Sequence, residues 1–228
     1  MNLGIFCAGS LGREILDIVV NNSCRKNWEN VIFIDDVTAE TSICGYKVLR
    51  SDQFKSEYPA DKVEILIGSG EPSCRKILQK KIKSDGFRLA TLISDKAFVG
   101  SGCTIEPGVI IFPFAYIGHE TIIKENTLVH SGANVEARCF VGDNTFLSAG
   151  AFVGADTTIG NLAFVGPGSV LRDHISIGNE AIVGMGSVVT ASVEENSVVV
   201  GNPARPIRDN DDKIIFKNKE NSRKGSCI

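Results

Sequence analysis

Aliphatic side chains recur with a period of six through the second half of the chain. From Ile93 to Val189 every sixth residue is Ile, Val or Leu, seventeen times without interruption. The residue two places earlier is usually small, and Gly often follows the aliphatic residue. An amphipathic helix needs a period of about 3.6, so the pattern excludes a helix here. It is typical of a hexapeptide β-helix, in which the aliphatic side chains share one core.

The pattern predicts this β-helix over residues 92–208, in roughly five to six coils of about eighteen residues each. No hexad is interrupted, so a site must lie on the surface of the prism or between prisms. The closing segment VVVGNPARPI is expected to end the ladder, because proline cannot donate a hydrogen bond to it. Residues 209–228 are polar and aperiodic, which predicts a loosely held tail.

Residues 1–91 show a different pattern, in which short apolar runs alternate with amphipathic segments. The runs LGIFCAG, VIFIDD and VEILIG are typical of strands, and FRLATLI leads into the repeats. The segments LGREILDIVVNN and PSCRKILQKKIKSDG are typical of helices, the second ended by Gly86. Strands that alternate with helices predict a small parallel sheet in an α/β, Rossmann-like domain.

Composition narrows the classes of function. The net charge of −3 offers no basic field for nucleic acid, and a hydrophobic content of 43% excludes disorder. No run of 18 apolar residues occurs and the first residues lack the features of a signal peptide, so we expect a cytoplasmic protein without a membrane partner. The seven cysteines have no CxxC spacing and there are three histidines, so we expect reduced thiols and no metal site.

A glycine-containing turn, Ala8-Gly9-Ser10-Leu11-Gly12-Arg13, follows the first predicted strand. Glycines let the backbone approach a phosphate, and the start of the helix supplies N–H groups and a positive dipole. Asp35 and Asp36 end the next strand, about where a Rossmann acid meets a ribose or a base. Cys7 stands where the first Gly of that motif belongs, and a tight turn without a ligand is the alternative. A sheet this short suits a nucleoside diphosphate better than NAD.

The AGSLGRE turn, the VIFIDD strand and the hexads that close with VVVGNPARPI together resemble the sialic-acid O-acetyltransferase-like sugar acyltransferases. That family includes the bacterial nucleotide-amino-sugar N-acetyltransferases of surface glycan synthesis. The resemblance covers residues 1–208 and implies an α/β N-terminal Rossmann-like domain followed by an all-β left-handed parallel β-helix. It also implies a homotrimer of parallel prisms, with acetyl-CoA as co-substrate in the groove between neighbours.

The resemblance further implies which residues contact each ligand. The nucleotide-sugar substrate is expected at Gly9, Ser10, Leu11, Gly12, Asp35, Asp36, Gly68 and Ser69. The arm of coenzyme A is expected along Ala155, Pro167 and Met185, which stand one coil apart or nearly so. Arg205 in the NPARP cap is the expected partner for a CoA phosphate.

The chain departs from this family at the catalytic motif, which is Glu-His-Asp/Glu followed by Cys-x-Ile-Gly. The same stretch here is Glu136-Ala137-Arg138-Cys139-Phe140-Val141-Gly142. The general-base histidine is therefore Ala137, and its acidic partner is Arg138. Acetyl transfer from CoA to an amine or a hydroxyl usually uses a base with a pKa near 7, and that base is missing from its usual place.

Two histidines are candidates to replace it. His119 lies eighteen residues before Ala137, so one coil and about 4.8 Å below it, and Glu120 beside it can orient the ring. His130 is the second candidate. It occupies a position where relatives carry an Asn near the active site, and its longer ring could extend toward the place where the base is missing. Taken singly, each histidine fits an ordinary surface role on a face of the prism better than a catalytic one. A third alternative uses no protein base, because a neutral, well-positioned sugar amine can attack the thioester unaided.

These observations predict an acetyl-CoA-dependent N-acetyltransferase that acts on a nucleotide-linked amino sugar, a 4-amino-4,6-dideoxy sugar, in surface glycan synthesis. Ala137 and Arg138 favour an alternative, a catalytically impaired trimeric homologue that binds nucleotide sugar and CoA as a scaffold or sensor. A sugar O-acetyltransferase is a further alternative. A trimer is also expected to cover five outward-facing aromatic residues: Phe112, Phe114, Phe140, Phe146 and Phe152.

Overall fold

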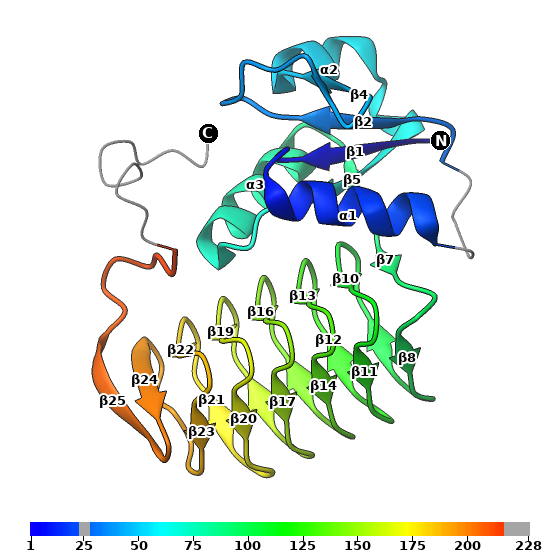
Figure 1. Ribbon diagram of the computed structural model, residues 1–228. Coiled ribbons are helices and arrows are strands. Elements are labelled where there is room, and N and C mark those ends of the chain that lie inside the picture. Colours follow the sequence, from blue (N-terminus) through cyan, green and yellow to red (C-terminus); the bar gives the residue numbers. More distant parts are fainter. Residues whose placement is uncertain (23–27, 217–228) are drawn as a thin grey trace.

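The computed structural model describes residues 1–22 and 28–216, and stacks an α/β domain on a three-sided β-helix (Figure 1). In the α/β domain the strand order is β3-β4-β2-β1-β5-β6, and all neighbours pair in parallel except β3 with β4. The predicted parallel sheet is confirmed. The elements of the α/β domain are β1 (Asn2–Phe6), α1 (Ser10–Asn21), β2 (Val31–Ile34), β3 (Ser42–Ile43), β4 (Tyr46–Leu49), α2 (Ser51–Glu57), the 3-10 helix η1 (Ala60–Lys62), β5 (Val63–Ile67), α3 (Pro72–Ser84) and β6 (Arg88–Leu89).

The β3–β4 hairpin and α2 are not predicted by the hydrophobic pattern. The hairpin turns at Cys44 and Gly45, which both adopt positive φ angles, 52° and 80°. Two such residues form the turn that matches the twist of paired strands, and Gly45 is its signal in the sequence. In α2 only Phe54 is buried, so this short helix shows no apolar period.

The β-helix has three faces built from two-residue strands, except for the longer β24 and β25 at its end. The domain face, under the α/β domain, contains β7 (Leu92–Ile93), β10 (Ile110–Ile111), β13 (Leu128–Val129), β16 (Phe146–Leu147), β19 (Phe164–Val165), β22 (Ile182–Val183), β24 (Ser197–Gly201) and β25 (Ala204–Asp209). The second face contains β8 (Phe98–Val99), β11 (Tyr116–Ile117), β14 (Asn134–Val135), β17 (Phe152–Val153), β20 (Val170–Leu171) and β23 (Val188–Val189). The third face contains β9 (Thr104–Ile105), β12 (Ile122–Ile123), β15 (Phe140–Val141), β18 (Thr158–Ile159) and β21 (Ser176–Ile177).

Strand pairing confirms the predicted coil. Ile110 pairs with Leu128 and Leu128 with Phe146, so these strands lie one coil of 18 residues apart. The last coil is shorter, because Ile182 pairs with Val198. The hexad aliphatics point inward, and most of them are fully buried in a core of their own. The fold is therefore an α/β domain followed by a left-handed parallel β-helix, as predicted.

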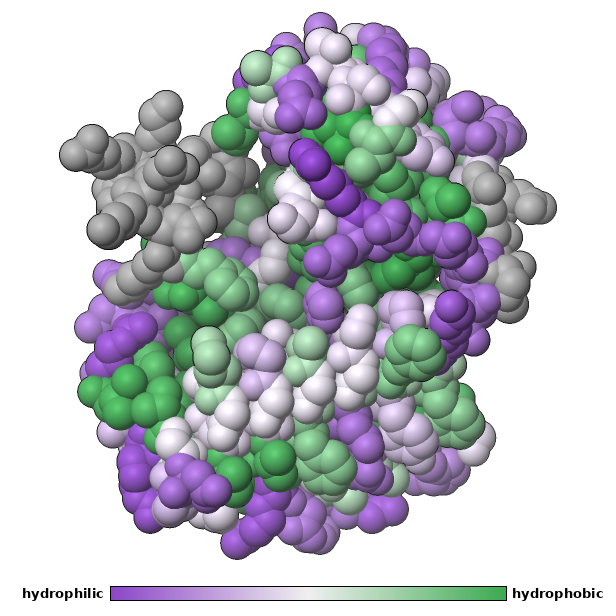
Figure 2. All heavy atoms as spheres, in the orientation of Figure 1, coloured by the Kyte–Doolittle hydropathy of each residue, from purple (hydrophilic) through white to green (hydrophobic). Residues whose placement is uncertain are grey.

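The domain face is apolar because the α/β domain covers it. Its outward side chains pack with residues of β1 and α1 into one shared core, and hydrophobic residues gather along the junction (Figure 2). Phe112 and Phe146 are 2% and 6% exposed, so they are covered within one chain and do not support a trimer. Phe114 and Phe140 remain exposed.

The end of the prism differs from the expected simple cap. β24 extends the domain face and β25 folds back antiparallel along it, with Pro206 in this edge strand. An edge position tolerates proline, because its missing N–H faces away from the ladder. Residues 210–216, within the expected polar tail, return to the α/β domain, and 217–228 lie outside the described residues. None of the helices in the described part of the chain has the length and apolar character needed to cross a bilayer.

Candidate active site

The turn between β1 and α1 is tight, and Cys7 starts it with a φ of 75°. Glycine is favoured at such an angle, which explains why the related motif has Gly at this position. Gly9 is the N-cap of α1 and has no side chain to occupy the first free N–H groups. Ser10, the first residue of the helix, is exposed, whereas Leu11 is half-buried and packs against the shared core.

The glycines of the turn have different roles. A Cβ on Gly12 would lie 2.0 Å from the Cys7 carbonyl oxygen, and a Cβ on Gly68 would lie 2.8 Å from it. Both positions therefore exclude a side chain so that α1, the turn and the end of β5 can pack together. A Cβ on Gly9 would meet nothing within 4 Å. Of these three glycines, only Gly9 opens onto free space.

Asp35 and Asp36 shape the loops beside the turn. Asp35 Oδ2 accepts the Ala8 N–H at 2.8 Å, and Oδ1 accepts two N–H groups of its own loop. Asp36 Oδ1 accepts the N–H of Ser51 at the start of α2, at 2.8 Å. The turn, the two aspartates and Gly68 thus meet at the carboxyl edge of the sheet. Their contacts with a nucleotide sugar stay a prediction.

Arg75, which sequence reasoning missed, attaches this edge to the prism. It is fully buried in α3, and its Nη1 donates to the carbonyl oxygens of Ile67 and Ser69, both at 2.9 Å. Nε and Nη2 donate to the main-chain oxygen and Oδ1 of Asn126, at 2.8 and 2.7 Å. Burial lowers the pKa of Arg75 to about 10, so the side chain remains charged at neutral pH. Arg75 lies three residues before the buried Leu78, on the same side of the helix, and this spacing is the signal in the sequence that indicates its burial.

His130 lies at the α1 edge, the corner between the domain face and the second face. Its ring stacks on Phe112 with centroids 4.3 Å apart, and Nε2 lies 3.2 Å from Glu14 Oε2 of α1. Nδ1 is buried without a hydrogen-bond partner. His130 therefore lies at the junction of the two domains, on a different edge from Ala137. Any catalytic role of His130 stays a prediction.

The corner between the second and third faces is the distal edge, opposite the domain face. Arg138 N–H donates to the His119 carbonyl at 2.8 Å, so His119 lies one coil below Ala137 as the spacing predicts. Two columns of residues run along this edge, one holding Ser101, His119, Ala137, Ala155 and Asp173, the other Glu120, Arg138, Asp156 and His174.

His119 makes two side-chain contacts on the distal edge. Its Nδ1 is 3.1 Å from Ser101 Oγ, and its Nε2 is 3.3 Å from Glu120 Oε1. With the ring proton on Nε2, Glu120 accepts it and Nδ1 accepts the hydroxyl hydrogen of Ser101. A carboxylate that holds one ring nitrogen and leaves the other as an acceptor is the arrangement of an oriented general base.

Arg138 is held in a bidentate ion pair. Its Nε and Nη2 donate to the two carboxylate oxygens of Asp156, both at 2.7 Å. The pair raises the pKa of Arg138 and lowers that of Asp156. His174 Nε2 lies 3.8 Å from the same carboxylate. The methyl group of Ala137 and this ion pair thus occupy the positions where the resemblance leads us to expect a His–acid pair.

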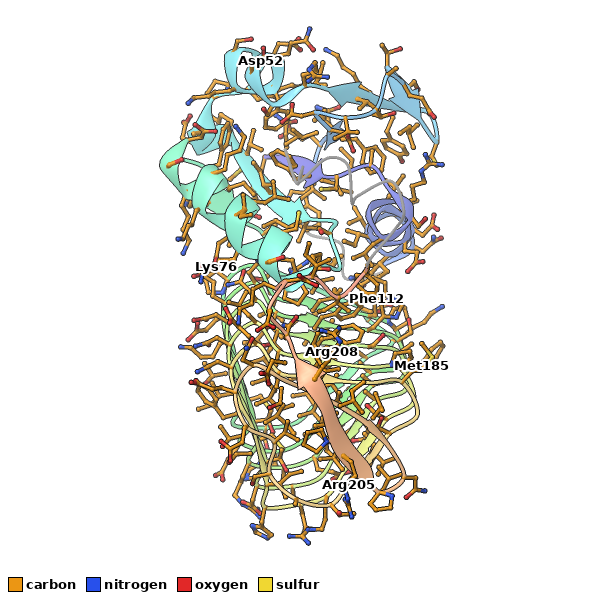
Figure 3. All side chains as sticks on the ribbon, turned by 90° about the vertical axis from the view of Figure 1, so that its left-hand side faces the viewer. Asp52, Lys76, Phe112, Met185, Arg205 and Arg208 are labelled. Carbon is orange, nitrogen blue, oxygen red and sulfur yellow. The ribbon has the colours of Figure 1, made fainter. Side chains whose placement is uncertain are left out.

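The expected CoA positions do not form one column. Pro167 and Met185 are adjacent on the α1 edge, where the Gly186 N–H donates to the Pro167 carbonyl at 2.9 Å, and Met185 is 78% exposed. Ala155 lies on the distal edge, so its expected alignment with Pro167 is wrong within one chain. Arg205 is exposed in the β24–β25 hairpin, away from Met185 (Figure 3). Its contact with a CoA phosphate stays a prediction.

Comparison with known proteins matches both parts of the chain. Residues 2–82 match the PglD N-terminal domain, and residues 138–173 and 156–191 match the bacterial transferase hexapeptide repeats. GDP-perosamine N-acetyltransferase of Escherichia coli O157:H7 is 31% identical over 122 residues, 49% of this chain and 54% of that protein. The match therefore spans about half the length of this curated relative.

Two solved structures share the fold over almost their whole length. The acetyltransferase domain of PglB from Neisseria gonorrhoeae has a TM-score of 0.84 and 23% identity, covering 90% of this chain and 99% of that one. PerB from Caulobacter crescentus, in complex with CoA and GDP-perosamine, has a TM-score of 0.72 and 20% identity, covering 91% and 98%. The chain thus combines a domain similar to the PglD N-terminal domain with hexapeptide repeats, and it is homologous to sugar N-acetyltransferases.

Proposed function

We propose that this protein is an acetyl-CoA-dependent N-acetyltransferase that acts on a nucleotide-linked amino sugar. The observation that carries the proposal is an open glycine turn, in a domain similar to that of PglD, stacked on an unbroken hexapeptide prism. The similar enzyme of Escherichia coli is named for GDP-perosamine, and PerB binds CoA and GDP-perosamine. The substrate class proposed here is a nucleoside diphosphate linked to a 4-amino-4,6-dideoxy sugar, in the synthesis of a bacterial surface glycan.

The two halves of the proposed site lie on opposite sides of one prism. The glycine turn lies above the domain face, whereas His119 lies on the distal edge. A second copy of the chain is therefore needed to bring an acceptor amine to His119, and we propose a homotrimer. The second face supports this, since its outward column is mostly apolar and partly exposed, with Phe98 stacked on Tyr116 at 5.1 Å. Acetyl-CoA then lies between the α1 edge of one chain, with Pro167 and Met185, and Ala155 of the next.

His119 is the proposed general base. The sugar amine attacks the carbonyl carbon of the thioester and forms the new C–N bond. His119 Nδ1 takes the amine proton, directly or through the Ser101 hydroxyl, while Glu120 holds Nε2–H. The C–S bond then breaks, and the CoA thiolate leaves and takes the proton that His119 has accepted, so the base is regenerated. In this scheme the base of the family has moved down by one coil, from Ala137 to His119.

One observation favours a second candidate, a trimeric homologue that binds both ligands without acetyl transfer. Arg138 is already paired with Asp156, so neither side chain is available to activate an amine in place of the missing base.

An O-acetyltransferase depends more strongly on a protein base than an N-acetyltransferase, because a hydroxyl must lose its proton as it attacks.

Thermal-shift screening against acetyl-CoA and GDP-, UDP- and dTDP-linked amino sugars, followed by an assay of CoA release, tests the proposal. With an active acceptor, His119→Ala is expected to lower kcat by roughly 10²–10⁴-fold with a smaller change in KM. His174→Ala, an exposed histidine on the same edge, is the control and is expected to keep the parental rate.

Each outcome selects one mechanism. If the parent binds both ligands but releases no CoA, the protein is the non-catalytic, ligand-binding homologue and not an N-acetyltransferase. If His119→Ala keeps the parental rate, His130→Ala distinguishes the other candidate base from unaided attack by a neutral amine. Transfer only to acceptors with a hydroxyl in place of the amine selects O-acetylation.

A further inference from the structure

Residues 210–216 form a strap that leads from the last coil to the α/β domain, beyond the part of the chain that resembles sugar acyltransferases. Asn210 anchors one end, because it is 4% exposed and its N–H donates to the Asn196 carbonyl at 2.8 Å. Its Nδ2 donates to the Glu180 carbonyl at 2.9 Å, and Lys213 pairs with the Glu180 carboxylate. The strap is therefore fixed to the prism before it reaches the domain above.

The other end of the strap binds the substrate loop, residues 68–71, which contains two of the expected nucleotide-sugar contacts. Glu71 Oε2 accepts the N–H groups of Ile215 and Phe216 at 3.0 and 3.1 Å. The ring of Phe216 packs edge-on against Phe164, with centroids 5.5 Å apart. A Cβ on Gly70 would lie 3.6 Å from the Phe216 ring, so the loop backbone passes close beside this ring.

The substrate loop is held from its inner side as well. The buried Arg75 donates to the carbonyl oxygen of Ser69 and to that of Ile67 just before the loop. Burial raises the pKa of Glu71, so this carboxyl group needs hydrogen-bond donors, and the strap supplies two. The loop thus has one support inside the fold and one that comes from the end of the described chain.

We propose that the strap is a positioning element for the nucleotide-sugar site, with Glu71 and Phe216 as its positioning residues. The proposal rests on the proposed function, which assigns Gly68 and Ser69 to the nucleotide sugar. A loop that is held in its binding shape loses little conformational freedom when the ligand arrives, so affinity falls when the support is removed. The proposed acetyl-CoA contacts Ala155, Pro167 and Met185 lie on the prism edges, so acetyl-CoA affinity is expected to stay unchanged.

The test uses full-length Glu71→Ala and Phe216→Ala. Ile214→Ala is the matched control, because Ile214 lies in the same strap and is about as exposed as Phe216, whereas Phe216 also packs against Phe164 and beside Gly70. KM, kcat and calorimetric Kd are measured with acetyl-CoA and with the nucleotide amino sugar that the parent acetylates. Both test variants are expected to raise Kd and KM for the nucleotide sugar by about tenfold, with kcat and the acetyl-CoA KM within about twofold. Glu71→Gln keeps an acceptor oxygen and is expected to restore most of the affinity.

Parental nucleotide-sugar affinity in both test variants would overturn the strap proposal and leave the proposed function intact. An equal loss of affinity for acetyl-CoA, together with a lower thermal midpoint, would also overturn it, because the strap would then be merely structural. A parent that binds no nucleotide sugar overturns the proposed function itself, and this result is visible before any variant is made.

Discussion

At the scale of single residues, two ionisable groups at the start of α3 have neutral hydrogen-bond partners: the half-buried Glu71, which is the N-cap of the helix, and the fully buried Arg75. The hydrogen bonds donated by Arg75 end on carbonyl and amide oxygens, and those accepted by Glu71 Oε2 come from backbone N–H groups. Arginine stays charged in such a place because its pKa is high. A glutamate does not have this margin, so Glu71 couples stability to pH.

We expect the contribution of Glu71 to stability to decrease as the pH rises. Burial raises its pKa in the folded state above the value that the unfolded chain keeps. The contribution is fully present below the unfolded pKa and is lost as the pH rises through the folded pKa. Scanning calorimetry between about pH 4 and 7 should therefore show Glu71→Gln gaining thermal midpoint relative to the parent. A difference between Glu71→Gln and the parent that stays constant across this pH range would contradict the expectation.

At the scale of elements, the β1–α1 turn separates a packing glycine from an open one. A side chain at Gly12 collides with the Cys7 carbonyl, so Gly12→Val disrupts the turn itself and does not test phosphate binding. Gly9 has an ordinary φ of −69° and free space around its Cβ position. It is therefore the position at which ligand binding can be changed without backbone strain.

Gly9→Asp is expected to weaken nucleotide-sugar binding by at least about tenfold, because its carboxylate would repel the phosphates at close range. Aspartate is also a favourable N-cap, so the thermal midpoint should stay the same or rise. Gly9→Asn has the same shape and capping ability without the charge and is the matched control. Calorimetry that finds equal losses for both variants would point to a steric effect, and parental binding by Gly9→Asp would rule out an anion site at this turn.

The sequence predicts the elements whose pattern is local and misses those that depend on distant partners. The hexads and the main strands follow directly from residue order. Arg75 is 51 residues from Asn126 and Glu71 is 144 residues from Ile215, so no local pattern reveals either contact. Two signals were nevertheless present. Ala155 and Pro167 are twelve residues apart, which is two thirds of a coil, so the spacing already places them on different edges of the prism. Outward apolar residues also recur every eighteen residues along one face, which indicates that this face is covered.

At the scale of the whole molecule, an active site shared between two chains predicts that two inactive variants can complement each other in a mixed trimer. A site built within one chain predicts no such complementation. A chain with His119→Ala lacks the base, and a chain with Gly9→Asp lacks the nucleotide-sugar turn. In a mixed trimer, some interfaces join the intact turn of one chain to the intact His119 of the next. Random mixing in equal amounts should restore about a quarter of the parental sites, since each half is intact with a probability of one half.

Light scattering and activity assays on co-expressed chains check this expectation. A stable monomer at micromolar concentration would rule out the trimer and the site between chains. Trimers that assemble normally but remain inactive when mixed would show that each chain builds its own site. The two results are distinguishable because mass and activity are measured on the same samples.

The core that joins the α/β domain to the prism limits how this protein can acquire a new substrate. Residues such as Leu3 and Ile15 of the α/β domain share one hydrophobic core with Leu128 and Phe146 of the prism, so the prism supplies one side of the core of that domain. A domain imported by recombination would meet outward side chains shaped for another partner and leave voids or overlaps at the seam. Those side chains are dispersed at 18-residue intervals along the prism, so a crossover could transfer all of them with the domain only by transferring the prism as well. Substrate range is therefore expected to drift through point substitutions in the exposed turns rather than through exchange of domains.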